Sequence, residues 1–209
     1  MENITLNNEQ LDALKEIANI GAGNAAIALS QLLNKKVLIT VPNIINFFGL
    51  DKVSDYAQSA NPSEISVAIS LNMLGPFKGC ISVLSSKKNT LLLIDILTGK
   101  TPGSTEVLNL IELSAFSECA NIISCAYLNA VGQLLNIHQL IPAMGKIMLD
   151  NAGELNKFFA KEFLSSNQSY ILPLEIHMYI EEIQLDLTVS FLLEQDSVKK
   201  ILSIVGLSG

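Results

Sequence analysis

Residues 11–39 read LDALKEIANIGAGNAAIALSQLLNKKVLI, and residues 113–141 read LSAFSECANIISCAYLNAVGQLLNIHQLI. The two stretches align without a gap at a constant offset of 102 residues, and 13 of their 29 positions are identical. Ordinary residue usage would give roughly two identities by chance. The chain is therefore interpreted as an internal duplication, in which each half is one copy of the same unit.

Each repeat is followed by the same order of expected elements. The runs ISVAISL (65–71) and LDLTVSF (185–191) have the patterns and lengths of strands. Gly75-Pro76 and Glu181-Glu182 are turn material between paired strands. The stretches 87–99 and 196–206 then read as helices that end each half.

The boundaries of the long helices also carry signals. Asn7 or Asn8 is the expected cap of the first helix, and Ser104 or Thr105 of the one that follows the joint at residues 98–104. Gly21 and Gly23 are expected where two helices approach closely, because the third glycine of a dinucleotide loop is missing.

These elements predict an α+β fold with pseudo-two-fold symmetry. The strands of the two halves are expected to share one mainly antiparallel sheet, beside long helices that carry the repeats. We expect residues 1–209 to form a single domain with halves at about 1–100 and 104–209. Two independent domains would each bury too little apolar surface and are the weaker alternative.

The composition excludes several classes of function. Hydrophobic residues make up 49% of the chain, charged residues 16%, and the formal net charge is −7. This content is sufficient for a full core, and no Lys/Arg cluster is present. The sequence therefore argues against nucleic-acid binding and against docking on an anionic membrane.

The chain has three cysteines, Cys80, Cys119 and Cys125, and two isolated histidines. The odd count and the lack of a CxxC spacing fit a reducing cytoplasm, and the simplest interpretation of the cysteines is small buried hydrophobes. Neither His138 nor His177 has a second His or a Cys at ligand spacing. No metal held by this chain is therefore predicted.

The stretch from Cys119 to Gly145 contains no Asp, Glu, Lys or Arg. Its many amides, together with Pro142, suit a buried helix followed by a strand better than a lipid-facing helix. Residues 1–5 lack the basic and apolar regions of a signal peptide. We expect no membrane span and a cytoplasmic location.

Three polar side chains share one face of each repeat helix. In the first repeat the spacing i, i+4, i+7 gathers Asp12, Glu16 and Asn19. A single such pair of Glu and Asn on an exposed helix is usually only solvated. The second repeat, however, keeps the stripe as Ser114, Glu118 and Asn121, although 16 of the 29 aligned positions differ. This retention favours a function.

A Glu/Asn pair is not a complete catalyst, because it contains no nucleophile beside a base. A carboxamide can donate and accept hydrogen bonds at once, so it can orient a water molecule. A carboxylate can hold a cation of a partner. Together the two groups could complete a phosphoryl-transfer site that another protein supplies.

The pattern D/S-x3-E-x2-N followed by a proline resembles the CheC family of phosphatases, which is related to CheX and FliY. It occurs as Asp12-x3-Glu16-x2-Asn19-x22-Pro42 and again as Ser114-x3-Glu118-x2-Asn121-x20-Pro142, where the interval to the proline is shorter. The resemblance extends over almost the whole chain in length and order of elements. Two copies favour CheC over CheX, which carries one, and the chain ends without the further switch domain of FliY.

The resemblance implies hydrolysis of the aspartyl phosphate of the response regulator CheY. Asn19 and Asn121 would orient the attacking water, and Glu16 and Glu118 would hold the active-site lysine of CheY. Asp12 and Ser114 would support the helix face, and Pro42 and Pro142 would shape the surface beside it. Mg²⁺ would belong to CheY, so no cofactor of this chain is implied. The family also binds the deamidase CheD.

Two other classes of function stay open at this point. The chain could be an adaptor that mainly binds CheD or phosphorylated CheY, with little hydrolysis of its own. It could also be a structural component of the flagellar motor, which the missing terminal domain disfavours. The presence of both amides favours the enzyme.

Overall fold

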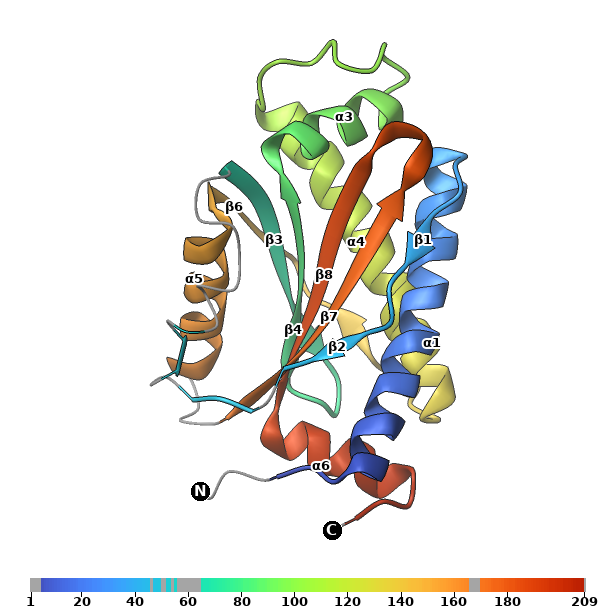
Figure 1. The fold of residues 1–209 in the computed structure, drawn as a ribbon, viewed down its shortest axis with the longest axis vertical. Helices are drawn as coiled ribbons and strands as arrows, with labels where there is room; N and C mark the ends of the chain where they lie inside the picture. Colours follow the sequence, from blue (N-terminus) through green and yellow to red (C-terminus); the bar gives the residue numbers. More distant parts are fainter. Residues whose placement is uncertain are drawn as a thin grey trace.

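Two long helices lie side by side against one face of a β-sheet, and a shorter helix covers part of the other face (Figure 1). The computed structural model describes residues 5–45, 47–49, 52, 53, 55, 65–165 and 170–208. Residues 1–4, which belong to the stretch inspected for a signal peptide, lie outside the described residues. The predicted α+β class is confirmed.

The long helices are α1 (Asn8–Leu33) and α4 (Leu110–Leu134), and they run antiparallel (Figure 1). A reciprocal cap starts α1. The side chain of Asn7 accepts a hydrogen bond from the backbone N–H of Gln10 at 2.9 Å, and the Gln10 side chain accepts one from the backbone N–H of Asn7 at 3.0 Å. Of the two predicted caps, Asn7 is the one used.

Shorter helices and the strands make up the rest of the described fold. In chain order they are β1 (Leu38–Ile39), β2 (Asn43–Ile44), β3 (Ile65–Leu74), β4 (Gly79–Ser86), α3 (Lys87–Leu97), β5 (Ile141–Pro142), β6 (Lys146–Asn151), α5 (Ala152–Ser165), β7 (Ile171–Ile180), the 3₁₀ turn η2 (Glu181–Ile183), β8 (Leu185–Glu194) and α6 (Gln195–Ile204). The predicted hairpin turns at Gly75-Pro76 and Glu181-Glu182 lie between paired strands, as expected.

The two halves exchange their short strands within one eight-stranded sheet. Each half supplies a long hairpin, β3–β4 or β7–β8, and the hairpins meet where β4 pairs with β8. The short strands β1 and β2 of the first half pair with β7 of the second, whereas β5 and β6 pair with β3 of the first. All of these pairings are antiparallel, so each half completes the sheet of the other.

The sheet has one apolar face and one more polar face. Ile81 on β4 and its cross-strand neighbour Phe191 on β8 are buried in the same core cluster as residues of α1 and α4. On the alternate positions, Ser70, Ser82 and Ser190 are cross-strand neighbours. Because side chains of a strand alternate between faces, these serines point away from α1 and α4, toward the side that α5 covers.

Small residues let α1 and α4 approach closely. A Cβ atom at Gly21 would lie only 2.5 Å from the Tyr127 ring. That ring is 4% exposed and stacks on Phe191, with ring centroids 3.6 Å apart. The prediction of a close approach is confirmed at Gly21. It is wrong at Gly23, where an added Cβ would meet nothing within 4 Å.

The joint between the halves is held by a buried carboxylate. Asp95, near the end of α3, is 0% exposed and accepts hydrogen bonds from the backbone N–H groups of Gly103 at 2.7 Å and Ser104 at 3.0 Å. The hydroxyls of Ser104 and Thr105 also donate to it. Burial favours a higher pKa, but these hydrogen bonds lower the pKa of Asp95 below its usual 3.8.

The prediction that Ser104 or Thr105 caps the second long helix is therefore wrong. Their polar groups are directed to Asp95, and Asn109 caps α4 instead, through its side-chain oxygen and the backbone N–H of Ile111 at 2.8 Å. A local capping signal was overridden by a carboxylate from the preceding helix.

Alanine at the two glycines of α1 tests the contact between the helices. Gly21→Ala is expected to lower the free energy of unfolding by about 1–3 kcal/mol, because Tyr127 cannot move away from Phe191 without losing packing. Gly23→Ala is the matched control and is expected to be neutral or stabilising by up to about 1 kcal/mol, through better helix propensity. Urea unfolding measures both values. Equal stability of the two variants would contradict the close contact at Gly21.

Asp95→Asn is expected to destabilise the fold by roughly 2–3 kcal/mol at neutral pH, because its donors lose an ionised acceptor. The lowered pKa of Asp95 stabilises the folded state above the unfolded-state value of 3.8, and this contribution disappears as the pH falls through the folded-state value. Unfolding measured from pH 7 to pH 3 should therefore show a smaller loss of stability in the variant. An identical pH profile in both proteins would refute the role of Asp95.

Candidate functional site

The three predicted residues of the first repeat lie on the exposed face of α1. Asp12, Glu16 and Asn19 are all exposed, while Ile17 and Ala18 of the same helix are buried in the core. Within the described residues, no ion pair neutralises Glu16 and no hydrogen bond restrains the side chain of Asn19. The carboxylate and the carboxamide are thus both available to a partner.

The second repeat presents the same stripe on α4. Ser114 and Glu118 are exposed, and Asn121 is half-buried. Phe116 and Ala120 on the opposite side of the helix are buried in the core. Since α1 and α4 are neighbours against the same face of the sheet, the structure brings the two stripes onto one helical layer (Figure 1).

The two amides differ in their surroundings. The Oδ1 atom of Asn121 accepts a weak hydrogen bond from the Cys125 thiol, with 3.8 Å between sulfur and oxygen. The position of the first repeat that matches Cys125 is Gly23, which has no side chain. Asn19 therefore lacks this neighbour.

The structure also corrects the interpretation of one cysteine. Cys80 and Cys119 are buried, as predicted, but Cys125 is only partly buried. Burial, followed by the nearby carboxylate of Glu118, raises the pKa of the Cys125 thiol. Sequence reasoning missed its contact with Asn121, although the i, i+4 spacing on a helix could have indicated it.

The two prolines lie on the segments that follow the motif helices. Pro42 is buried between β1 and β2, and Pro142 is half-buried in β5, opposite Met73 of β3. The β1 and β5 segments lie at opposite ends of the strand order of the sheet. The two prolines therefore lie toward opposite edges of the sheet, although Pro42 follows β1 and Pro142 is part of β5.

The arrangement supplies no nucleophile beside a base. His138 lies after the end of α4, and His177 lies on β7, where its Nδ1 atom is 3.1 Å from the hydroxyl of Thr188. No histidine is therefore part of either helix stripe. What α1 and α4 offer is an accepting carboxylate and an amide that can both donate and accept.

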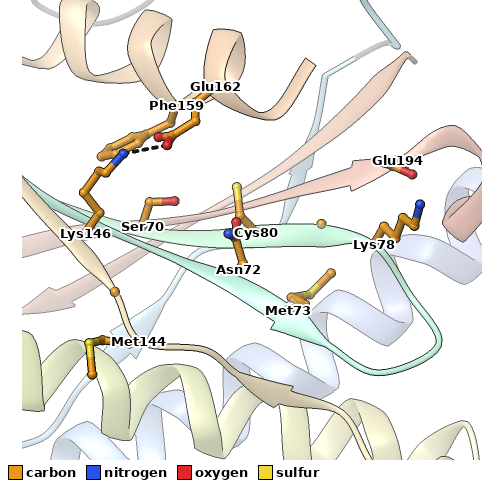
Figure 2. A pocket seen from close by; sticks show the side chains of 12 residues that line it. Ser70, Asn72, Met73, Lys78, Cys80, Met144, Lys146, Phe159, Glu162 and Glu194 are labelled. Carbon is orange, nitrogen blue, oxygen red and sulfur yellow. Dashed lines mark hydrogen bonds and ion pairs between the residues drawn. The ribbon is translucent and has the colours of Figure 1, made fainter. Parts of the chain in front are cut away.

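A hollow lies on the α5 side of the sheet, and Figure 2 shows the residues that line it. Its volume is about 590 Å³, and none of the motif residues lines it. The Nζ atom of Lys146 lies 2.6 Å from the Oε1 atom of Glu162, so this positive charge is paired. Burial raises the pKa of the Cys80 thiol to about 12, so it stays protonated at neutral pH. The hollow is therefore separate from the polar stripes of α1 and α4.

Within the described residues, no group of three or more His, Cys, Asp and Glu side chains is arranged to hold a metal ion. Nor does any helix in the described part combine the length and apolar character needed to cross a membrane.

Comparison with known proteins gives three findings. The profile of the CheC-like family matches residues 9–45, which include the first motif. The chain is 28% identical to the CheY-P phosphatase CheC of Bacillus subtilis over 204 residues, which cover 96% of this chain and 95% of that protein. The crystal structure of FliY from Thermotoga maritima superposes with a TM-score of 0.75 at 23% identity and covers 99% of this chain and 100% of that one.

The fold also matches a solved complex. A CheX–CheY–BeF₃–Mg²⁺ structure from Borrelia burgdorferi superposes with a TM-score of 0.54 at 12% identity, over 85% of this chain and 97% of the other. At such identities, the FliY and CheX structures show a shared fold.

Thiol counting tests the placement of the cysteines. One equivalent of Ellman's reagent is expected to react with the folded protein before the other two, at Cys125, because Cys80 and Cys119 are each 2% exposed. The raised pKa of Cys125 should make this reaction slower than that of a free thiol. Unfolding should expose the thiols of Cys80 and Cys119 to the reagent. Cys125→Ser should abolish the equivalent that reacts in the folded protein, and a reaction of the folded protein that survives this substitution would contradict the placement.

Proposed function

We propose that this chain, which belongs to the CheC-like family, hydrolyses the aspartyl phosphate of the response regulator CheY. The proposal is supported by the 28% identity to a CheY-P phosphatase along 96% of the chain. The observation that carries it is structural: each of two neighbouring helices carries a Glu and an Asn at matched positions of the repeat, and of these four side chains only Asn121 is half-buried rather than exposed.

In this mechanism the carboxamides of Asn19 and Asn121 orient the attacking water. An acyl phosphate is already an activated electrophile, so hydrolysis needs a water held in line with the bond that breaks. The amide oxygen can accept a hydrogen bond from that water, while the amide N–H donates one to a phosphoryl oxygen. Neither group changes its protonation state.

The carboxylates of Glu16 and Glu118 hold the active-site lysine of CheY. A carboxylate one turn before the amide can bind an ammonium group and so fix the helix against the regulator. Asp12 and Ser114 support the same face one turn earlier, and Pro42 and Pro142 shape the neighbouring surface. These roles come from the family resemblance, and the exposure of the four helix residues is compatible with them.

The metal of the reaction is proposed to belong to CheY. The Borrelia complex contains CheX, CheY, BeF₃ and Mg²⁺. By analogy, Mg²⁺ and the phosphoryl group would arrive with the regulator, and this chain would contribute side chains alone. A cytoplasmic location and binding of CheD are further parts of the proposal, implied by the family resemblance.

Both sites are proposed to belong to one domain made of halves at about 1–100 and 104–209. The exchange of short strands between the halves supports this view, because β1, β2, β5 and β6 each pair with a strand of the other half. Separate halves would leave these strand edges unpaired.

Release of phosphate from freshly phosphorylated CheY tests the function. The double variant Asn19→Ala/Asn121→Ala is expected to lose on the order of 10²-fold in turnover or more, because neither site can orient the water. Each single variant should keep the activity of its intact site. Asn24→Ala is the matched control, since Asn24 is exposed on α1 and its side chain bonds the backbone oxygen of Ile20 at 2.9 Å.

Wild-type turnover in the double variant would overturn the enzymatic proposal. Loss of turnover with unchanged binding of phosphorylated CheY would support the assigned roles of the amides. Turnover near the spontaneous rate in the wild type, together with tight binding, would instead favour the adaptor.

A further inference from the structure

The two sites are not equivalent, and the difference lies one turn after each amide. At Asn121 the residue four positions on is Cys125, whose thiol donates to Oδ1 across 3.8 Å. At Asn19 the residue four positions on is Gly23, and a Cβ atom there would meet nothing within 4 Å. The first amide is thus next to open space and the second is next to a thiol.

A donor at this position restricts the orientation of the amide. The Asn side chain has two terminal groups, and a thiol donor beside it favours the orientation in which Oδ1 faces the thiol. The Nδ2 group then points away from Cys125. Because Asn121 is half-buried and Asn19 exposed, the second amide is also the more confined of the two.

We propose that Cys125 is a positioning residue of the second site, which holds the Asn121 carboxamide in the orientation that catalysis needs. The inference rests on the proposed function for its catalytic part. The first site lacks a side-chain donor beside its amide, because the residue that matches Cys125 is Gly23. The duplicated sites therefore differ in how well their amides are pre-oriented, and only the second depends on a free thiol.

Chemical modification of Cys125 should consequently silence one site and spare the other. An adduct on its sulfur removes the S–H donor and adds bulk one turn from Asn121, on the helix that also carries Glu118. The probe is N-ethylmaleimide: its double bond forms a bond to the thiolate sulfur, and the resulting carbanion takes a proton from water. Cys80 and Cys119 are each 2% exposed and should not react in the folded protein.

Single-site variants separate the two contributions. Asn19→Ala leaves the second site alone, and Asn121→Ala leaves the first. In the Asn19→Ala background, adding Cys125→Ala is expected to lower kcat about two- to fivefold with little change in KM, as for loss of one weak hydrogen bond. Cys125→Ser, which keeps a donor, should lose less. In the Asn121→Ala background, Cys125→Ala should change neither constant.

Modification gives the sharper contrast. N-ethylmaleimide is expected to lower the turnover of Asn19→Ala at least about tenfold, a change of about 1.4 kcal/mol in the barrier, and to leave Asn121→Ala within about twofold. Gly23→Cys, placed in Asn121→Ala/Cys125→Ser, should transfer the sensitivity to the first site, because the space beside Gly23 accepts a side chain. Equal sensitivity of both single-site variants would overturn the proposal.

A readout without catalysis keeps this inference separate from the proposed function. The side-chain NH₂ signals of Asn121 in a ¹⁵N–¹H spectrum should shift in Cys125→Ala, whereas those of Asn19 should not. Shifted signals in a protein without phosphatase activity would sink the proposed function and retain the contact. Unmoved Asn121 signals, or unchanged kcat in Asn19→Ala/Cys125→Ala, would overturn the positioning role.

Discussion

The close contact of α1 with α4 is the constraint on which the rest of the structure depends. Ala22 and Ser124, which occupy matched positions of the repeat, are both 0% exposed. Gly21 admits the ring of Tyr127, which in turn stacks on Phe191 of β8 and so ties the helix pair to the sheet. The small residues of both helices face the core. The polar stripes lie on the other side of each helix, so they must face outward. The placement of Glu16, Asn19, Glu118 and Asn121 follows from this packing.

The exchanged strands make that packing a property of the whole chain. Since each half supplies edge strands to the hairpin of the other, neither helix can shift without disturbing a shared sheet. The sheet beneath the two antiparallel helices holds the backbones that carry the two amides in a defined arrangement, which a water-orienting mechanism requires. Duplication also allows divergence: one copy can keep the exposed arrangement of Asn19 while the other acquires a thiol beside Asn121. The two proposed sites can therefore differ in rate.

The sequence predicted most of the fold because the repeat and the strand patterns are strong local signals. The order of helices and strands, the cap at Asn7 and the turns at Gly75 and Glu181 all follow from residue type and spacing. The predictions that were wrong concern residues whose environment is set by tertiary contacts rather than by the local sequence. Ser104 and Thr105 are residues of the type that caps helices, but their hydroxyl groups donate to the buried carboxylate of Asp95 instead. Gly23 resembles a packing glycine but lies beside open space, and the partial exposure of Cys125 depends on which face of α4 meets the sheet. The motif stripes could be named in advance, whereas their inequality could not.

The central claim is that the two carboxamides enter the active site of the regulator, and side-chain NMR with an activated regulator tests it directly. CheY activated with beryllium fluoride, a stand-in for the phosphoryl group, would be added to ¹⁵N-labelled protein. The NH₂ signals of Asn19 and Asn121 should shift or broaden, those of Asn24 should stay in place, and CheY without beryllium fluoride should have a much smaller effect. Changes confined to the hollow around Lys146 and Asn72, with Asn19 and Asn121 unmoved, would contradict the claim.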